Sequence, residues 1–272
     1  MTIVVGFDWL TETVMIADTR VSWENNQFPP KDILRKLYTL GDSKKSAVLG
    51  FSGDLHAAKK VMTFLIKQKF LGYKRPFVIR QFRDDLHQWI EEIALAKLTP
   101  KQRKELSFML CGIEPSRRPS ILEDGKITGY TPFTESHIYV YTIGENGNVR
   151  VNKRPKGFAI IGTGRKLRKA VIEQIQETIH FGFNDPKLHW ARAALINEIV
   201  ASLAKENKAV STVGGPFQVI RITPDGLKTD YTWPPDVDSK NVEIRIEGSK
   251  TIIHNPASGE SYVLHPIWDS PF

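Results

Sequence analysis

The chain has 272 residues, a formal net charge of +8 at pH 7 and a hydrophobic fraction of 41%. These values are typical of one large or two small globular domains with a true buried core. We find neither a run of the ~18 apolar residues that a membrane helix needs nor a charged and apolar leader, which argues against a membrane span and a secretory signal. The single cysteine, Cys111, excludes an internal disulfide, as in most cytoplasmic proteins, and we expect it on a buried strand.

The basic residues are spread along the chain and do not form one block. The clusters at residues 101–104 and 165–169 lack the interleaved aromatic side chains that stack on bases, so we predict solvated surfaces and no nucleic-acid partner. The seven histidines show no paired ligand spacing, so we predict no metal site. Residues 157–163 imitate the start of a phosphate loop, but Thr163 stands where the lysine is required, and we predict no cofactor.

The first predicted element is a hairpin that begins beside Met1. The apolar run at residues 3–5 predicts a buried strand, and residues 14–17 predict its partner, which would bring Asp18 close to Thr2. Removal of the initiator methionine is favoured when the next side chain is small, and it would leave Thr2 with a free α-amine. That amine is a base close enough to activate the threonine hydroxyl as a nucleophile.

A second hairpin and two helices follow. Residues 33–40 and 46–51 predict the hairpin strands, and Ser52-Gly53-Asp54 begins a helix that ends near Gly72. Pro76 opens the next helix, and residues 106–113 predict a strand. We expect a long loop or insertion over residues 114–132, because this stretch contains Pro115, Pro119, Gly125 and Gly129.

The second half repeats the order of strands before helices. Strands are predicted at residues 137–143, 149–152 and 158–161, helices at about 164–181 and 186–206, and a last hairpin at 217–222 and 228–233. Alternating runs of strands and helices of this kind predict an α+β fold with two packed sheets and a helix layer outside each.

The chain continues beyond this pattern. We predict one domain over residues 1–233 and a β-rich C-terminal extension over 234–272 that packs on the core or on a neighbouring subunit. The extension has two short β-like runs, at 242–246 and 251–254, and an apolar end at 263–268.

Six short motifs, in order, resemble those of the proteasome β-subunit-like N-terminal-nucleophile (Ntn) hydrolases. They are Thr2; Ala17-Asp18-Thr19-Arg20; Arg35-Lys36-Leu37; the strand that ends in Ser52-Gly53; Gly162-Thr163-Gly164; and Gly214-Gly215 with Asp225-Gly226. The resemblance covers roughly residues 2–232. Among bacterial members the chain resembles HslV, the ancestral β-subunit type and the betaproteobacterial proteasome homologue, with the last two favoured by its length and its tail. The resemblance implies the four-layer αββα sandwich of the Ntn-hydrolase fold.

The resemblance also implies roles for single residues. Thr2 would be the nucleophile, Lys36 and Asp18 would tune it, and the N–H of Gly53 would hold the oxyanion. Thr163 keeps a hydroxyl where the family has serine. Arg20, Ser22 and Ser52 would flank the substrate. Valine occupies both helper positions of a further motif, at Val210 and Val213, and Ser211 is the candidate replacement. Lys31 is a rival for the lysine role.

The function implied is that of a cytoplasmic threonine protease without a cofactor, which cleaves amide bonds inside a homo-oligomeric double ring. Stacked rings of six or seven subunits would admit peptides or unfolded proteins, and an ATPase or unfoldase partner is not identifiable from the sequence. Two alternatives remain open: an Ntn amidase for a small-molecule amide, and a self-assembling shell with a weak or silent site.

Overall fold

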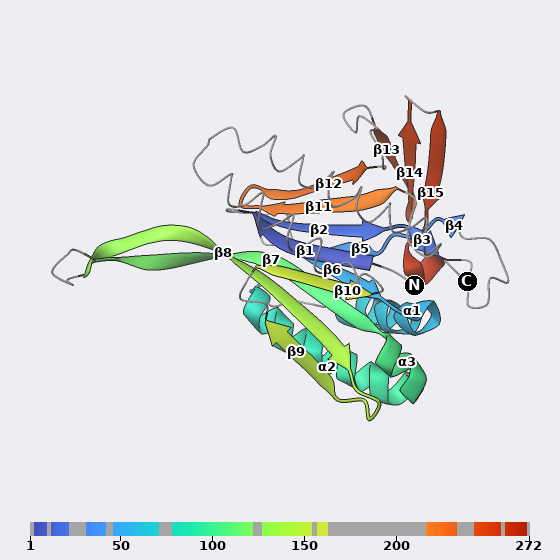
Figure 1. Ribbon diagram of the computed structural model, residues 1–272, viewed down its shortest axis with the longest axis horizontal. Helices are drawn as coiled ribbons and strands as arrows, with labels where there is room; N and C mark the ends of the chain where they lie inside the picture. The colour runs from blue at the N-terminus through green and yellow to red at the C-terminus, as the bar shows by residue number, and fades with distance from the viewer. Residues whose placement is uncertain are drawn as a thin grey trace.

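The computed structural model describes residues 3–9, 12–21, 31–41, 46–70, 78–121, 127–153, 157–162, 216–232, 242–256 and 259–270. Within them lie two five-stranded antiparallel sheets (Figure 1). The first sheet has the order β10-β1-β2-β11-β12, formed by Phe158–Gly162, Ile3–Trp9, Glu12–Asp18, Phe217–Thr223 and Gly226–Thr232. The second has the order β5-β6-β7-β8-β9, formed by Leu37–Gly41, Ser46–Ser52, Ser107–Ile121, Ile127–Ile143 and Val149–Lys153.

The two sheets pack face to face through a shared apolar core. That core joins Val4, Met15 and Ile220 of the first sheet to Val48 and Met109 of the second, all nearly inaccessible to solvent. Since side chains alternate between the faces of a strand, these residues define the inner faces of the two sheets. The expected α+β fold is confirmed.

Helices cover the outer face of the second sheet. Helix α1 spans Leu55–Phe64 and continues as the π-helical η2, Leu65–Phe70; helix α2 spans Ile79–Lys97 and α3 spans Pro100–Glu105. Asp54 caps α1 by accepting a hydrogen bond from the backbone N–H of Ala57, and Thr99 caps α3 with a capping box. None of the described helices is long and apolar enough to cross a membrane.

The outer face of the first sheet is buried as well. Ile3, Val5, Phe7, Val14 and Ile16 are fully shielded from solvent, although they alternate with the residues that face the second sheet. The helices predicted at about 164–181 and 186–206 lie outside the described residues. Three of the four expected layers are therefore described, and the fourth stays a prediction.

The loop expected over residues 114–132 is wrong for its described part. Strands β7 and β8 pair as far as Ile121 and Ile127, and they form a two-stranded arm that leaves the body of the molecule (Figure 1). Pro115, Pro119 and Pro132 lie on every second rung of the arm. Pro115 and Pro119 belong to β7, and Pro132 of β8 faces Arg117, which lies midway between them. In an antiparallel pair every second rung makes no hydrogen bonds across the ladder, and a proline on such a rung removes no ladder bond.

The C-terminal extension forms a small sheet and a final turn. Its order is β13-β14-β15, formed by Glu243–Glu247, Lys250–Asn255 and Glu260–Leu264. The sequence predicted the first two strands and missed the third. The 3₁₀ helix η5, Ile267–Asp269, follows and buries Ile267 against the core around α1. The proposed boundary between residues 233 and 234 falls outside the described residues and stays a prediction.

Candidate active site

A buried ion pair lies where the two sheets meet at the start of β1. Nζ of Lys36 is 3.0 Å from Oδ1 of Asp18, and the two side chains are 1% and 0% exposed. Asp18 is the last residue of β2, and Lys36 stands directly before β5. Each partner therefore comes from a different sheet, so the pair depends on how the sheets pack.

Further hydrogen bonds fix both partners. Oδ1 of Asp18 also accepts the backbone N–H of Ile3 at 3.0 Å, and Nζ of Lys36 donates to the carbonyl oxygen of Arg20 at 2.6 Å. The second carboxylate oxygen, Oδ2 of Asp18, is buried and has no hydrogen-bond partner within the part of the chain that the structure describes. The site thus retains an acceptor that a further donor can use.

Burial raises the pKa of Asp18, because a carboxylate loses its hydration between the sheets. The Lys36 ammonium and the Ile3 N–H oppose that increase. Burial together with a charged partner is a combination that shifts pKa values at functional sites.

The backbone around the pair is cross-linked. Two short strands, β3 (Arg20–Val21) and β4 (Lys31–Asp32), pair beside it. Between Asp18 and β3, the carbonyl of Thr19 accepts from Ile33 and Leu34 at 3.2 and 3.1 Å, and its hydroxyl donates to Pro216 at 2.8 Å. The rival Lys31 is exposed on β4, whereas Lys36 is buried, which distinguishes the two lysines.

Gln218 is a site residue that the sequence analysis missed. It lies on β11, is 4% exposed and reaches across to the second sheet. Its Oε1 accepts from the backbone N–H of Leu37 at 3.1 Å, and its Nε2 donates to the Leu37 carbonyl at 3.2 Å. The amide therefore fixes the residue next to Lys36. The available signal was its alternation with Ile220 and Ile222, which places a polar group on an apolar face.

Gly53 occupies a position that only glycine fits. Its φ is +115°, and a Cβ atom there would lie 1.9 Å from the carbonyl oxygen of Glu105. Ser52, beside it, is buried at the end of β6 and faces Ser107 on β7. The glycine is therefore required by the packing before α1, and its role as an oxyanion donor stays a prediction.

Four predicted residues lie outside the described part of the chain: Thr2, Ser22, Thr163 and Ser211. The described strands end close to two of them in sequence. Ile3 pairs with Gly162, so β1 begins one residue after Thr2 and β10 ends one residue before Thr163. The structure brings together Asp18, Lys36 and the Arg20 carbonyl, and the catalytic roles assigned to all these residues stay predictions.

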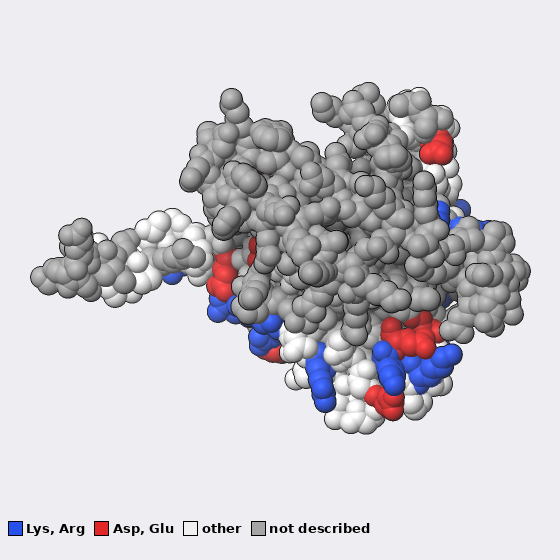
Figure 2. All heavy atoms as spheres, in the orientation of Figure 1, with Lys and Arg blue, Asp and Glu red and all other residues white. Residues whose placement is uncertain are grey.

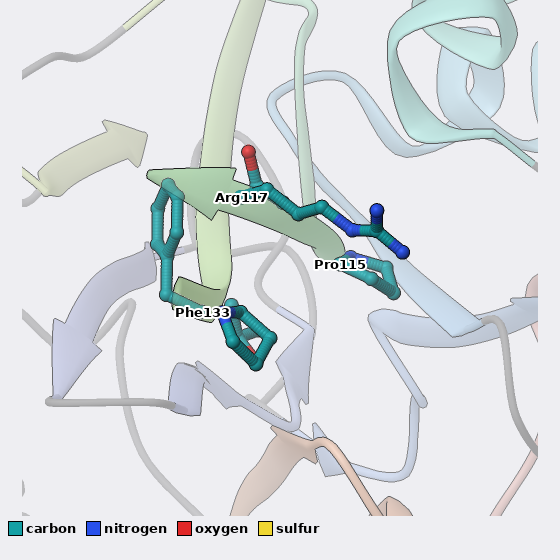
Figure 3. Close-up of a pocket in the computed structure, with 6 residues that line it drawn as sticks. Pro115, Arg117 and Phe133 are labelled. Carbon is teal, nitrogen blue, oxygen red and sulfur yellow. The ribbon is translucent and has the colours of Figure 1, made fainter. Parts of the chain in front are cut away.

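The hollow on the arm is a separate feature. It has a volume of about 400 Å³ and is lined by residues 115–117 and 132–134, among them Pro115, Arg117 and Phe133 (Figure 3). Pro115 lies seven residues along β7 from Phe108, which pairs with Phe51 beside the site end of β5. At ~3.3 Å a residue, the hollow begins roughly 23 Å along β7 from the rung that lies beside the site.

Charged side chains of both signs lie on the described surface (Figure 2). Figure 2 shows basic and acidic side chains interspersed over the lower part of the face in view. Lys104, for example, pairs with Glu145 at 2.9 Å. Among the described residues, no three His, Cys, Asp or Glu side chains gather closely enough to hold a metal ion.

Solved structures of Anbu proteins share this fold. The Anbu (Gly-1) mutant from Hyphomicrobium sp. strain MC1 is 19% identical, with a TM-score of 0.56 over 89% of this chain and 92% of that one. Anbu (ancestral beta-subunit) from Yersinia bercovieri is 13% identical, with a TM-score of 0.54 over 84% and 86%. Anbu from Pseudomonas aeruginosa, solved as a helical assembly, is 16% identical, with a TM-score of 0.56 over 86% and 88%.

These comparisons correct the family assignment made from the sequence. No family model matches the chain, and no curated protein matches it. The six motifs were interpreted as a resemblance to the proteasome β-subunit-like hydrolases, with HslV, the ancestral β-subunit type and the betaproteobacterial homologue as candidates and the last two favoured. The similar structures above are all Anbu proteins, the ancestral β-subunit type. Identities of 13–19% show likeness of fold alone, so the chain is not assigned to that family.

Proposed function

We propose that this protein is an N-terminal threonine hydrolase that cleaves amide bonds. The observation that carries the proposal is the buried pair of Lys36 and Asp18, whose carboxylate also accepts the N–H of Ile3. Ile3 is the residue bonded to Thr2. A buried ion pair is a weak device for stability, because desolvation offsets most of the attraction, so its presence beside a candidate nucleophile favours a chemical role.

The chemistry follows from the residue types. Once Met1 is removed, the Thr2 amine takes the proton of the Thr2 hydroxyl, and Oγ1 attacks the carbonyl carbon of the substrate. The negative charge that develops on the substrate oxygen is stabilised by the Gly53 N–H, and the Lys36 ammonium assists. The leaving amine departs with the proton from the Thr2 amine. Water then hydrolyses the ester and restores the hydroxyl.

Self-assembly of the chain is the second part of the proposal. The Pseudomonas aeruginosa protein with this fold is titled a helical assembly of the Anbu complex. Head-to-tail contacts generate closed rings or open helices, depending on the rotation between subunits. We propose a homo-oligomer in the cytoplasm that encloses its sites and so admits peptides or unfolded chains. Ring size and any ATPase partner are not specified by this argument.

Covalent labelling tests the activity. A peptide β-lactone should acylate Thr2 in the protein that has lost Met1, and intact mass followed by peptide mapping identifies the residue. Thr2→Ala should abolish labelling and hydrolysis and leave the melting temperature unchanged. Labelling elsewhere, or hydrolysis by the alanine variant, contradicts the proposal. A protein that keeps its buried pair but never reacts would favour the shell with a silent site, and reaction with small amides alone would favour the amidase.

A further inference from the structure

The C-terminal segment of the chain lies against the residues that carry Lys36. His265 bridges to Leu34 in parallel: its N–H donates to the Ile33 carbonyl at 2.8 Å, and its carbonyl accepts from the Arg35 N–H at 3.0 Å. On their other side, Ile33 and Leu34 donate their backbone N–H groups to the carbonyl of Thr19, which follows Asp18. Residues 33–35 are therefore held between the strand that supplies the carboxylate and the end of the chain.

Tyr38 makes a second link between the same two segments. Its hydroxyl donates to the Arg35 carbonyl at 2.6 Å and accepts from the Ile267 N–H at 2.9 Å. The Arg35 carbonyl belongs to the peptide bond that leads into Lys36. The Tyr38 hydroxyl thus joins that peptide bond directly to η5.

The C-terminal segment is itself firmly attached. The rings of Trp268 and Tyr38 lie 5.1 Å apart between centroids, and Nζ of Lys59 on α1 donates to the Ser270 carbonyl at 2.7 Å. Tyr38, Ile267 and Ser270 are each at most 5% exposed. Burial raises the pKa of Tyr38, so the phenol keeps its proton and remains a donor at neutral pH.

We infer that residues 265–268 position Lys36, and that Tyr38 transmits this constraint as a positioning residue. The inference rests on the proposed function for its catalytic meaning, but the placement of Lys36 is testable without activity. A 1% exposed side chain that ends 3.0 Å from its partner has little freedom to correct a shift of its own backbone. Loosening the C-terminal segment therefore moves Nζ away from Asp18 before it unfolds either sheet.

Tyr38→Phe is the sharpest test, because it removes one oxygen atom and keeps the ring. Tyr141→Phe is the matched control: Tyr141 is equally buried, its hydroxyl donates to the Arg83 carbonyl at 3.1 Å, and it lies on β8, three strands from β5. Both variants lose a hydroxyl bond to a backbone carbonyl, and Tyr38→Phe also loses the bond from the Ile267 N–H. A difference between them in the protection of Lys36 therefore reports the link between the Arg35 carbonyl and Ile267, which Tyr141 does not make.

The readout independent of activity is a short pulse of N-hydroxysuccinimide acetate, with acetylation of each lysine quantified by peptide mass spectrometry. Lys36 should be acetylated roughly tenfold faster in Tyr38→Phe, where its amine leaves the buried pair, and at the wild-type rate in Tyr141→Phe. The exposed Lys31 is the internal reference for reagent strength. Equal protection of Lys36 in the two variants overturns the inference, whether or not the protein hydrolyses anything.

The activity readout is the rate of Thr2 labelling by the β-lactone. It should fall about tenfold in Tyr38→Phe, which is less than the ~100-fold that a 1 Å misplacement can cost, and stay within about twofold of wild type in Tyr141→Phe. Trp268→Ala, which withdraws the ring packed on Tyr38 and breaks no hydrogen bond in the described structure, should act in the same direction. If wild type itself does not label, the proposed function fails and the acetylation result still decides the role of the C-terminal segment.

Discussion

Asp8 and Asp18 lie at opposite ends of the hairpin formed by β1 and β2, and burial raises the pKa of both carboxyl groups. Their partners differ. Asp18 has the Lys36 ammonium at 3.0 Å, whereas the described partners of Asp8 are the hydroxyls of Thr13, at 3.3 Å, and Ser136. Burial with hydroxyl donors leaves a carboxyl group that titrates with a pKa of about 6. Burial with a cation gives an ion pair that is shielded from solvent.

The largest expected effect comes from breaking the pair. Lys36→Met keeps the length of the stem and leaves the Asp18 carboxylate buried without its cation, which should cost about 3–5 kcal/mol of unfolding free energy at pH 7. Urea unfolding measures this loss, and labelling of Thr2 should disappear with it. Lys31→Met, on the exposed strand β4, should change stability by less than about 0.5 kcal/mol.

The double variant Asp18→Asn/Lys36→Met separates stability from chemistry. It removes both charges, so it should regain most of the stability that Lys36→Met loses, yet it should not label at Thr2. A double variant that labels at the wild-type rate would show that the pair is structural only.

The second prediction concerns the Asp8 end of the hairpin, where burial outweighs the opposing effect of the Lys153 charge. The pKa of Asp8 is raised from 3.8 to about 6, so its favourable contribution to stability is fully present below pH 3.8 and is lost as pH rises through about 6. This shift in the pKa of Asp8 corresponds to at most about 3 kcal/mol of unfolding free energy. Asp8→Asn abolishes this titration and should gain stability relative to wild type between pH 4 and pH 8.

Denaturant unfolding of wild type and Asp8→Asn at pH 4 and pH 8 measures that gain. The difference in unfolding free energy between the two proteins should move in favour of Asn by up to about 3 kcal/mol. A difference that is the same at both pH values would mean that Asp8 does not titrate in this range.

The sequence alone predicts Asp18 and Lys36 better than it predicts Gln218 and His265, which bond to the backbone on either side of Lys36. The apolar pattern at residues 14–17 predicts a strand that ends directly before Asp18. The pattern at residues 33–40 predicts the strand near Lys36, although the structure begins that strand at Leu37. The local pattern around Gln218 marks a polar residue on an apolar face but does not identify its partner. The partners of Gln218 and His265, Leu37 and Leu34, lie more than 180 residues away in the chain. Long-range contacts of this kind depend on sheet packing, which local periodicity does not encode.

The arm formed by β7 and β8 is a second case in which the local sequence does not determine the structure. Pro115 and Pro119, with Gly125 and Gly129, were interpreted as signs of a loop, since proline removes a backbone donor. Whether a rung uses that donor depends on the register between β7 and β8, and a single strand does not reveal it. The sequence therefore identified the segment and assigned it the wrong structure.

The third prediction tests whether Gln218, through Leu37, helps to hold Lys36 beside Asp18. Gln218→Leu leaves the N–H and carbonyl of Leu37 unpaired between the sheets, which should cost about 1–3 kcal/mol. Because Leu37 follows Lys36, the Thr2 labelling rate should also fall, whereas a general loss of stability would leave the rate of the folded protein unchanged. Gln218→Glu keeps the shape and one acceptor, so its labelling rate should lie between those of wild type and Gln218→Leu.

The smallest expected effect sharpens the account of Asp8. Thr13→Val keeps the shape of a side chain that is fully buried and removes the hydroxyl that donates to the Asp8 carboxylate. That donor lowers the pKa of Asp8, so the pKa should rise above about 6 in the variant. The loss of stability should be about 0.5–1.5 kcal/mol at pH 8, where the carboxylate is charged, and smaller at pH 4.

The matching control for Thr13→Val is the same substitution in the Asp8→Asn background. With no carboxylate to charge, the loss of the hydroxyl should have an effect that does not depend on pH. If Thr13→Val instead costs as much at pH 4 as at pH 8 in the wild-type background, the hydroxyl only fills space. The contrast between the two ends of the hairpin would then rest on Lys36 alone, since the hydroxyl would contribute nothing to the charge of Asp8.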